Sequence, residues 1–341
     1  MRIPEVNADA GYIYDLIEAP IKTELLMTGL KLGVFDHLSD FVDAVQVAGA
    51  AGTHPPNTAL LLDHLAMIDL VEKRNGLYRN RPIAETFLVS GNPAYLGPLC
   101  KSTVRHYQPV TARLEEIIVQ GPPDSVSHEE AMGSPEFWSE HIKALVGWAY
   151  SGIALQMAGI IAELPEFRQM GRMLDLGGGP GIFAVAFVAA HEDLKAVVFD
   201  MPEVVKAAQK CIADHGMQDR ISTMAGDYLT DDIGSGYDLI WASSTLSCAH
   251  GCLDELVAKI HGALNPGGLF ACLAGGLTDE RTKPDAMLAH IAMCMTGHDV
   301  RFDQGDIADA MLRVGFKSVR SRTIKAIAGP MELDIGRKAK D

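Results

Sequence analysis

The sequence contains no run of eighteen or more apolar residues, which a membrane-spanning helix would need. Its first residues, MRIPEVNADAGYIYD, also lack the basic stretch and the apolar stretch of a secretory signal peptide. We therefore expect a cytoplasmic protein that has no membrane partner.

Cysteine is sparse, with six residues scattered along 341 positions. A chain of this length buries enough apolar surface to fold without disulfides, so we expect reduced thiols. Positive charge is in deficit as well, because 44 acidic side chains against 29 lysines and arginines leave a formal net charge of -15. Nucleic-acid binding depends on basic side chains that displace counterions, so we expect no nucleic-acid partner.

Residues 1–100 contain the pattern of a winged helix. Residues 21–35 are apolar nearly all round, which indicates a buried helix. Two helices separated by a proline-rich turn follow, and then a short ribbon around Asn75-Gly76. The second of these helices offers only Asp63 and His64 as charged or titratable groups, so we predict a structural role and not DNA reading.

Residues 101–165 keep a helical pattern that Pro165 ends, and the pattern then changes. Across 166–341, apolar strands alternate with helices, the first four strands falling at 173–176, 196–199, 221–224 and 238–242. This alternation predicts an α/β domain with a Rossmann-like, mostly parallel sheet. A helix at 253–264, a strand at 269–273, a helix near 307–314 and a strand at 317–324 complete it, and we expect the tail after Gly329 to be an edge segment or loosely held.

The strongest motif is the glycine-rich turn 175–181, DLGGGPG, between an apolar strand and a helix. Glycines there let the backbone approach a ligand closely. Asp175 can meet the ammonium of the methionine part of S-adenosylmethionine, with Gly177 and Gly179 beside it. Residues 179–184 also match the dinucleotide pattern GxGxxA, so a nicotinamide-dependent oxidoreductase stays an alternative. A carboxylate near a pyrophosphate would repel it, which favours S-adenosylmethionine.

Two more carboxylates follow the next two strands. Asp200 can accept both hydroxyls of a ribose, although it can equally serve the start of a helix before Pro202. Asp227 can take an adenine amino group, or can belong to an ordinary Gly-Asp turn. With their neighbours Met201 and Tyr228, they complete the predicted cofactor site.

Four segments, DLGGGPG, VVFDMPEV, AGDYL and LNPGG, resemble the small-molecule O-methyltransferases typified by the hydroxyindole, caffeate and hydroxyneurosporene enzymes. TELLMTGLKLGVFDHL and the winged helix after it look like that family's dimerisation domain, so the resemblance covers nearly the whole chain. It implies a class I S-adenosylmethionine-dependent methyltransferase that forms a homodimer and acts on a small-molecule acceptor.

The resemblance also marks a departure at the catalytic position. The family carries a histidine just after a leucine following the fourth strand, and Ser247 stands there in this chain. Serine is no base near neutral pH without an activating partner. His250 is the preferred substitute, because an imidazole suits proton acceptance, although it can equally be a solvent-facing loop residue. We match Asp299 to a second family carboxylate that would orient the base.

The resemblance places residues 137–157 on a helix that lines the acceptor pocket, so His141 and Trp148 are candidate substrate contacts, although core packing explains the aromatics as well. Two clusters of thiols and imidazoles should border the same pocket. One is Cys248, His250 and Cys252, and the other is His290, Cys294 and His298 at four-residue intervals on an expected helix. Such groups suit a soft ion or a soft substrate. We expect no metal, and we take Cys294 and His298 as substrate candidates.

The missing family histidine keeps other chemistry open. Methylation of carbon, nitrogen or sulfur, or a reaction that transfers no methyl group, would also use bound S-adenosylmethionine. A dimeric ligand sensor without catalysis is a further alternative.

Overall fold

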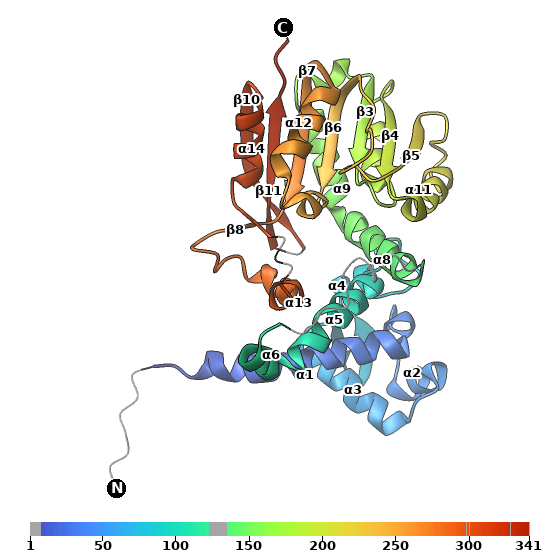
Figure 1. Ribbon diagram of the computed structural model, residues 1–341. Coiled ribbons are helices and arrows are strands. Elements are labelled where there is room, and N and C mark those ends of the chain that lie inside the picture. The colour runs from blue at the N-terminus through green and yellow to red at the C-terminus, as the bar shows by residue number, and fades with distance from the viewer. Residues whose placement is uncertain (1–7, 123–134, 298, 300, 328, 341) are drawn as a thin grey trace. The chain divides into compact units, whose positions relative to one another are not determined.

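The computed structural model describes residues 8–122, 135–297, 299, 301–327 and 329–340 (Figure 1). The chain divides into two compact units, Met1–Lys101 and Ser102–Asp341. Each unit has its own apolar core.

The N-terminal unit has the predicted order of a winged helix. It comprises α1 (Gly11–Leu32), the 3-10 turn η1 (Val34–His37), α2 (Ala44–Ala51), α3 (Pro55–Met67), β1 (Val71–Arg74), β2 (Leu77–Asn80) and α4 (Pro82–Phe87). Strands β1 and β2 pair antiparallel around Asn75 and Gly76, whose φ angles of 51° and 80° suit a tight hairpin turn. Phe35, Leu62 and Leu65 are fully buried at the centre of this unit.

A seven-stranded sheet forms the centre of the second unit, in the order β10-β11-β7-β6-β3-β4-β5. Five strands are parallel: β3 (Arg172–Leu176), β4 (Lys195–Asp200), β5 (Ile221–Ala225), β6 (Tyr237–Ser243) and β7 (Leu264–Ala274). Strands β10 (Ser318–Ala326) and β11 (Gly329–Arg337) run antiparallel to them. The predicted α/β class with a mostly parallel sheet is confirmed.

Helices cover both faces of this sheet. On one face lie α9 (Ala154–Ala162), α10 (Ile182–Ala189) and α11 (Pro202–Asp214), and on the other α12 (Leu253–Ala263) and α14 (Asp306–Val314). Successive strand residues point to opposite faces. Met173 therefore packs in the apolar core beneath α9, α10 and α11, and Leu174 packs in the core beneath α12 and α14. Because helices cover both faces of the sheet, its parallel strands are apolar along almost their whole length.

Two sequence expectations at the end of the sheet are wrong. The tail after Gly329 is strand β11, which lies between β7 and β10 and is not an edge. Asp334 is buried in this strand, and Gly336 lies flush against Phe316 and Met311. Strand β7 begins at Leu264, earlier than expected, because a register shift after Tyr237 takes up the Asn-Pro-Gly-Gly segment.

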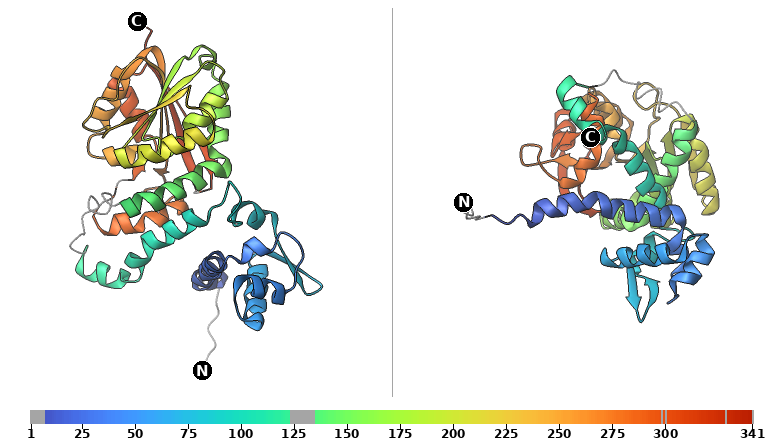
Figure 2. Two further views of the ribbon diagram at one scale, coloured as in Figure 1. Left: turned by 90° about the vertical axis from the view of Figure 1, so that its right-hand side faces the viewer. Right: turned by 90° about the horizontal axis from the view of Figure 1, so that it is seen from below.

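Several short elements lie at the carboxyl ends of the parallel strands (Figures 1 and 2). They are α8 (Pro135–Trp148), β8 (Gly276–Leu277), η5 (Asp285–His290), α13 (Ile291–Met295) and β9 (Phe302–Asp303), and α5 (Gly97–Thr111) and α6 (Leu114–Gln120) precede them in the chain. A π-helical turn (Ala149–Ile153) joins α8 to α9, and Gly152 at φ 110° kinks it, so the helix expected up to Pro165 is interrupted. Residues His141–Ala162 are long and apolar enough to cross a membrane, but Met157 and Ile161 are fully buried in the core.

Candidate active site

The glycine-rich turn lies between β3 and α10, and its backbone leaves no room for side chains. Gly177, Gly179 and Gly181 have φ angles of 62°, 55° and 75°, in the left-handed region. A Cβ atom on Gly177 would lie 2.2 Å from Oγ1 of Thr245, and one on Gly178 would lie 2.7 Å from the Asp175 carboxyl carbon. The backbone therefore turns sharply at the carboxyl edge of the sheet, next to the loop after β6.

Asp175 points into the protein. Its side chain is only 1% exposed, and Oδ2 accepts a hydrogen bond of 3.1 Å from the amide of Ala184 in the first turns of α10. Burial raises the pKa of this carboxyl to about 7. In this position Asp175 joins the end of β3 to α10 beneath the turn.

Asp200 joins the glycine turn to the end of β4. Oδ2 accepts from the amide of Gly179 at 2.7 Å, and Oδ1 accepts from the amide of Met201 at 2.7 Å. Its backbone carbonyl accepts from Gly226 at 3.0 Å, which brings in the end of β5. Burial raises the pKa of Asp200, and Met201 beside it is 39% exposed. Three predicted cofactor segments thus meet at one edge.

Asp227 and Tyr228 shape the loop after β5. Oδ1 of Asp227 accepts from the amide of Leu229 at 2.9 Å, in a local turn. The hydroxyl of Tyr228 donates to the carbonyl of Thr245 at 2.8 Å and accepts from its Oγ1 at 2.9 Å. Lys259 from α12 donates to the carbonyls of Tyr228, Leu229 and Asp231. Sequence reasoning did not identify Thr245 and Lys259, which hold two loops together.

The loop after β6 carries the residues that the sequence associated with catalysis. Ser247 is half-buried on the short turn η4 (Leu246–Ala249), whose Leu246 and Ala249 anchor it in the core. His250 is exposed, and its ring stacks on Phe302 of β9 with centroids 5.4 Å apart. At the start of the loop, Oγ of Ser243 is buried and has no hydrogen-bond partner among the described residues. No local pattern in the sequence marks Ser243.

Asp299 is held by two arginines. Arg301 donates to it from Nε at 2.7 Å and Nη2 at 2.8 Å, and Arg281 donates at 3.0 Å. The hydrogen bonds from Arg301 keep the pKa of this carboxyl well below its usual range. Arg281 also binds Asp303 at 2.6 Å. This network ties the loop after β8 to β9.

The predicted acceptor contacts fall in different surroundings. His141 is half-buried on α8, whereas the Trp148 ring packs against Phe183 at 5.6 Å, next to the buried Trp241. Cys294 lies on α13, and burial raises the pKa of its thiol. Helix α13 ends at Met295 and Gly297 adopts a φ of 82°, so the expected four-residue series does not continue, and His298 lies outside the described residues. Within the described part, no three His, Cys, Asp or Glu side chains are grouped for a metal ion.

The sequence indicated no catalytic role for His106 or His290, which the structure brings close together. Burial is the main cause that lowers the pKa of His290 on η5, and the positive charges of Arg301 and His106 lower it further. His106 of α5 likewise lowers the pKa of the half-buried His141. These side chains come from separate segments of the chain, so no local spacing marks them.

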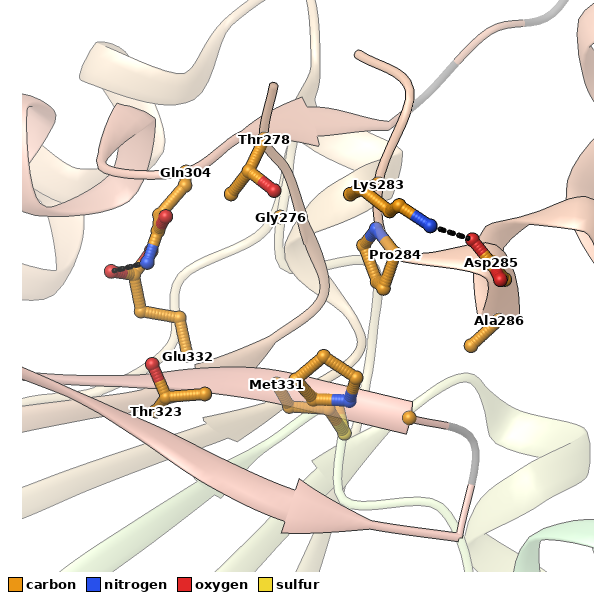
Figure 3. Close-up of a pocket in the computed structure, with 12 residues that line it drawn as sticks. Gly276, Thr278, Lys283, Pro284, Asp285, Ala286, Gln304, Thr323, Met331 and Glu332 are labelled. Carbon is orange, nitrogen blue, oxygen red and sulfur yellow. Dashed lines mark hydrogen bonds and ion pairs between the residues drawn. The ribbon is translucent and has the colours of Figure 1, made fainter. Parts of the chain in front are cut away.

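A cavity of about 530 Å³ lies between β8, η5 and β11 (Figure 3). Its charged lining groups are already paired, since Lys283 binds Asp285 at 2.8 Å and Glu332 accepts from Gln304 and from the amide of Gly305. These interactions leave it less suited to a charged ligand than the edge formed by β3, β4 and β6.

Comparison with known proteins identifies the family of this chain. A model of the O-methyltransferase domain matches residues 113–317, and one of the O-methyltransferase dimerisation domain matches residues 14–90. The chain belongs to the O-methyltransferase family. The predicted family, the S-adenosylmethionine-dependent methyltransferase activity and the cofactor are thereby confirmed.

Individual relatives agree with the family. A 3-hydroxy-5-methyl-1-naphthoate 3-O-methyltransferase from Streptomyces sahachiroi is 27% identical, over 90% of this chain and 89% of its own. The N,N-dimethyltransferase OxyT from Streptomyces rimosus is 28% identical, over 85% and 84%. The structure of human N-acetylserotonin methyltransferase in complex with S-adenosylmethionine superposes with a TM-score of 0.81 at 23% identity, covering 98% of this chain and all of that one.

Proposed function

We propose that this methyltransferase moves a methyl group to a hydroxyl oxygen of a small-molecule acceptor, at the carboxyl edge of β3, β4 and β6. The observation that supports this most is the Asp200 carboxylate bound to the Gly179 amide, which puts an acid and a bare backbone turn side by side. S-adenosylmethionine has an aminoacyl end, a ribose and an adenine, and the three loops after β3, β4 and β5 offer a site for each.

The residues fit this cofactor in several ways. Gly177 and Gly179 present backbone without side chains to the aminoacyl end, and Asp175 supports them from below through α10. Asp200 retains lone pairs that could accept from the ribose hydroxyls, while Asp227 and Met201 would border the adenine. The buried Oγ of Ser243 lacks a partner at the end of β6, and a polar group of the cofactor would supply one. Tyr228 positions Thr245 against Gly177.

The bound sulfonium supplies a methyl group with a neutral thioether as its leaving group. The protein has to align the acceptor, which accounts for up to about 7–11 kcal/mol of the barrier in well-oriented reactions. It also has to remove the hydroxyl proton. Ser247 does not do this unaided, so we assign the step to a histidine at this edge, either His250, expected from the sequence, or His290, found in the structure. Asp299, bound by two arginines, anchors the segment before β9.

Nitrogen is the second candidate acceptor atom, because the relative OxyT is named as an N,N-dimethyltransferase. The naphthoate relative is named for transfer to oxygen. Incubating the protein with labelled S-adenosylmethionine and a panel of phenols and aryl amines separates the two. We expect the label in methyl ethers, and label found only in methylamines would contradict this.

We also propose a homodimer formed through α1. Its first half exposes six large apolar side chains, each at least 55% exposed within the chain: Tyr12, Ile13, Tyr14, Leu16, Ile17 and Ile21. Most of them lie within the segment that matches the dimerisation domain. A second copy is the partner that would cover them.

We also propose a cytoplasmic location, which fractionation of cells expressing the tagged chain would test.

Calorimetry with S-adenosylhomocysteine tests the cofactor site. We expect one binding event for each chain and no heat with NADH. Heat with NADH alone would favour the oxidoreductase alternative. Binding without any methyl transfer to the acceptor panel would favour the sensor.

A further inference from the structure

His290 lies at the carboxyl edge of the sheet, at the end of η5. Met287, three residues earlier, packs against the backbone just after β7, where a Cβ on Gly275 would lie 2.2 Å from its methyl carbon. Strand β7 pairs with β6, and the loop after β6 carries Ser247. His290 therefore borders the same edge as the position where the family has its histidine.

Side chains from three other segments surround His290. Arg301 precedes β9, His106 belongs to α5, and His141 on α8 lies close enough to His106 for their charges to interact. Leu145, one turn after His141, would lie 3.4 Å from a Cβ on Gly179. The histidine cluster, defined here as His106, His141 and His290, thus continues along α8 to the glycine turn. Figure 2 shows α8 and α13 across this end of the sheet.

The surroundings of His290 favour a neutral ring. Burial, Arg301 and His106 lower the pKa of His290, whereas the Met287 carbonyl and Asp299 act in the opposite direction. Asp299 is already bound by Arg301 and Arg281, and it also raises the pKa of the neighbouring Cys294 thiol. Nδ1 of His290 is shielded from solvent and has no hydrogen-bond partner among the described residues. With Nδ1 enclosed, Nε2 is the ring nitrogen left to meet an acceptor.

We propose that His290 is the general base for methyl transfer, in place of the family histidine that Ser247 replaces. The acceptor O–H bond breaks and its proton passes to Nε2 of His290, giving an imidazolium. The oxygen electron pair forms the bond to the methyl carbon, while the carbon–sulfur bond breaks and its electrons stay on sulfur. The charge of Arg301 stabilises the oxygen as it becomes negative. This assignment rests on the proposed O-methylation.

His250 is the competing base, and its surroundings differ. It is exposed and stacked on Phe302. A base in contact with bulk water is less protected from solvent during the reaction than the partly buried His290. The structure thus favours His290 over His250.

Three variants separate these possibilities: His290→Gln, His250→Gln and the control His261→Gln. His261 is also a partly buried histidine with a lowered pKa, but it lies at the end of α12 that joins β7, away from the carboxyl edge. With 2-naphthol and catechol as acceptors, we expect His290→Gln to lower kcat roughly 10²- to 10⁴-fold. It should leave S-adenosylhomocysteine affinity unchanged, and His261→Gln should behave as wild type.

The pH profile gives a readout that a purely structural role would not change. Because the base acts unprotonated, wild-type kcat/KM should rise with pH and level off below about pH 6.5, the ordinary imidazole value. His290→Gln should lose this rise. If His290→Gln keeps both kcat and the rise, or if His250→Gln is the variant that loses them, the assignment is overturned.

An NMR titration tests the contact without turnover. In the complex with S-adenosylhomocysteine, 2-naphthol should shift the ring signals of His290, identified from their loss in His290→Gln, and leave those of His261 in place. Unmoved His290 signals overturn the assignment. Failure of the wild-type protein to bind S-adenosylhomocysteine would instead contradict the proposed function itself.

Discussion

Asp200 accepts a 2.7 Å hydrogen bond from the backbone amide of Gly179, 21 residues earlier in the chain. Together with the hydrogen bond of 3.2 Å from the Gly178 amide to the Phe199 carbonyl, this contact holds the end of β4 against the glycine turn. It also keeps the Asp200 carboxylate at the sheet edge. There the carboxylate shapes the turn and still has lone pairs for a ligand.

Asp200→Asn should weaken binding of S-adenosylhomocysteine about 10- to 100-fold, because hydrogen bonds to a charged group contribute about 1.5–3 kcal/mol. Isothermal calorimetry measures the change. Asp214→Asn, an exposed site at the end of α11, is the matched control and should bind as wild type. Equal affinities for wild type and Asp200→Asn would place the ribose elsewhere.

Ser243→Ala tests the buried hydroxyl at the end of β6. Since Oγ has no partner among the described residues, its removal should not lower stability in the unliganded protein. It should weaken S-adenosylhomocysteine binding several-fold, by about 0.5–1.5 kcal/mol, because one hydrogen bond is lost. Unchanged affinity together with lower thermal stability would mean that the hydroxyl serves the fold and not the ligand.

Gly177→Ala should lower the free energy of unfolding by about 1–3 kcal/mol, because it combines a left-handed backbone with a clash against Thr245. Gly262→Ala is the control, since this glycine lies in α12 with open space around its Cβ position. That variant should be neutral or more stable by about 0.5–1 kcal/mol. Urea unfolding gives both values, and a stable Gly177→Ala protein would show that the turn is not confined.

Asp334 should make stability depend on pH. Its side chain is 1% exposed, accepts from Ser321 at 2.5 Å, and has a pKa raised by burial from 3.8 to about 6. Between these values the folded state binds more protons than the unfolded state, so the free energy of unfolding should fall as pH rises from about 4 to about 6.

Asp334→Asn removes this dependence and should stabilise the protein above pH 6, by at most about 3 kcal/mol. Chemical denaturation at several pH values measures the difference between the two proteins. A difference that stays constant from pH 4 to pH 7 would mean that Asp334 titrates normally in the fold.

The double variant Ile13→Glu/Ile17→Glu tests the dimer. Two charges on the exposed apolar face of α1 should convert the dimer to a monomer, which light scattering coupled to gel filtration detects. Leu155→Glu places a charge on a side chain that is 74% exposed on α9, and it should leave the mass unchanged. A wild-type monomer, or a double variant that stays dimeric, would contradict the proposal.

Local signals in the sequence were enough for much of this protein. The apolar strands, the Asn75-Gly76 hairpin and the glycine turn between β3 and α10 each depend on neighbours in the chain, through side-chain period or through φ angles that glycine adopts freely. The same turn, with Asp200 and Asp227 after the next two strands, placed the predicted cofactor residues at one edge, because parallel strands present their carboxyl ends together.

Tertiary structure decided what depends on residues distant in the chain. Pairing with β7 and β10 makes an internal strand of the segment after Gly329, and a strand's place in a sheet is not encoded in its own pattern. The hydroxyl of Tyr228 meets Thr245 and not open solvent, and Arg301 with Arg281 occupies Asp299. His290 and His106 are 184 positions apart, and only folding brings their charges close enough to change a pKa, since such electrostatic effects depend on distance in space.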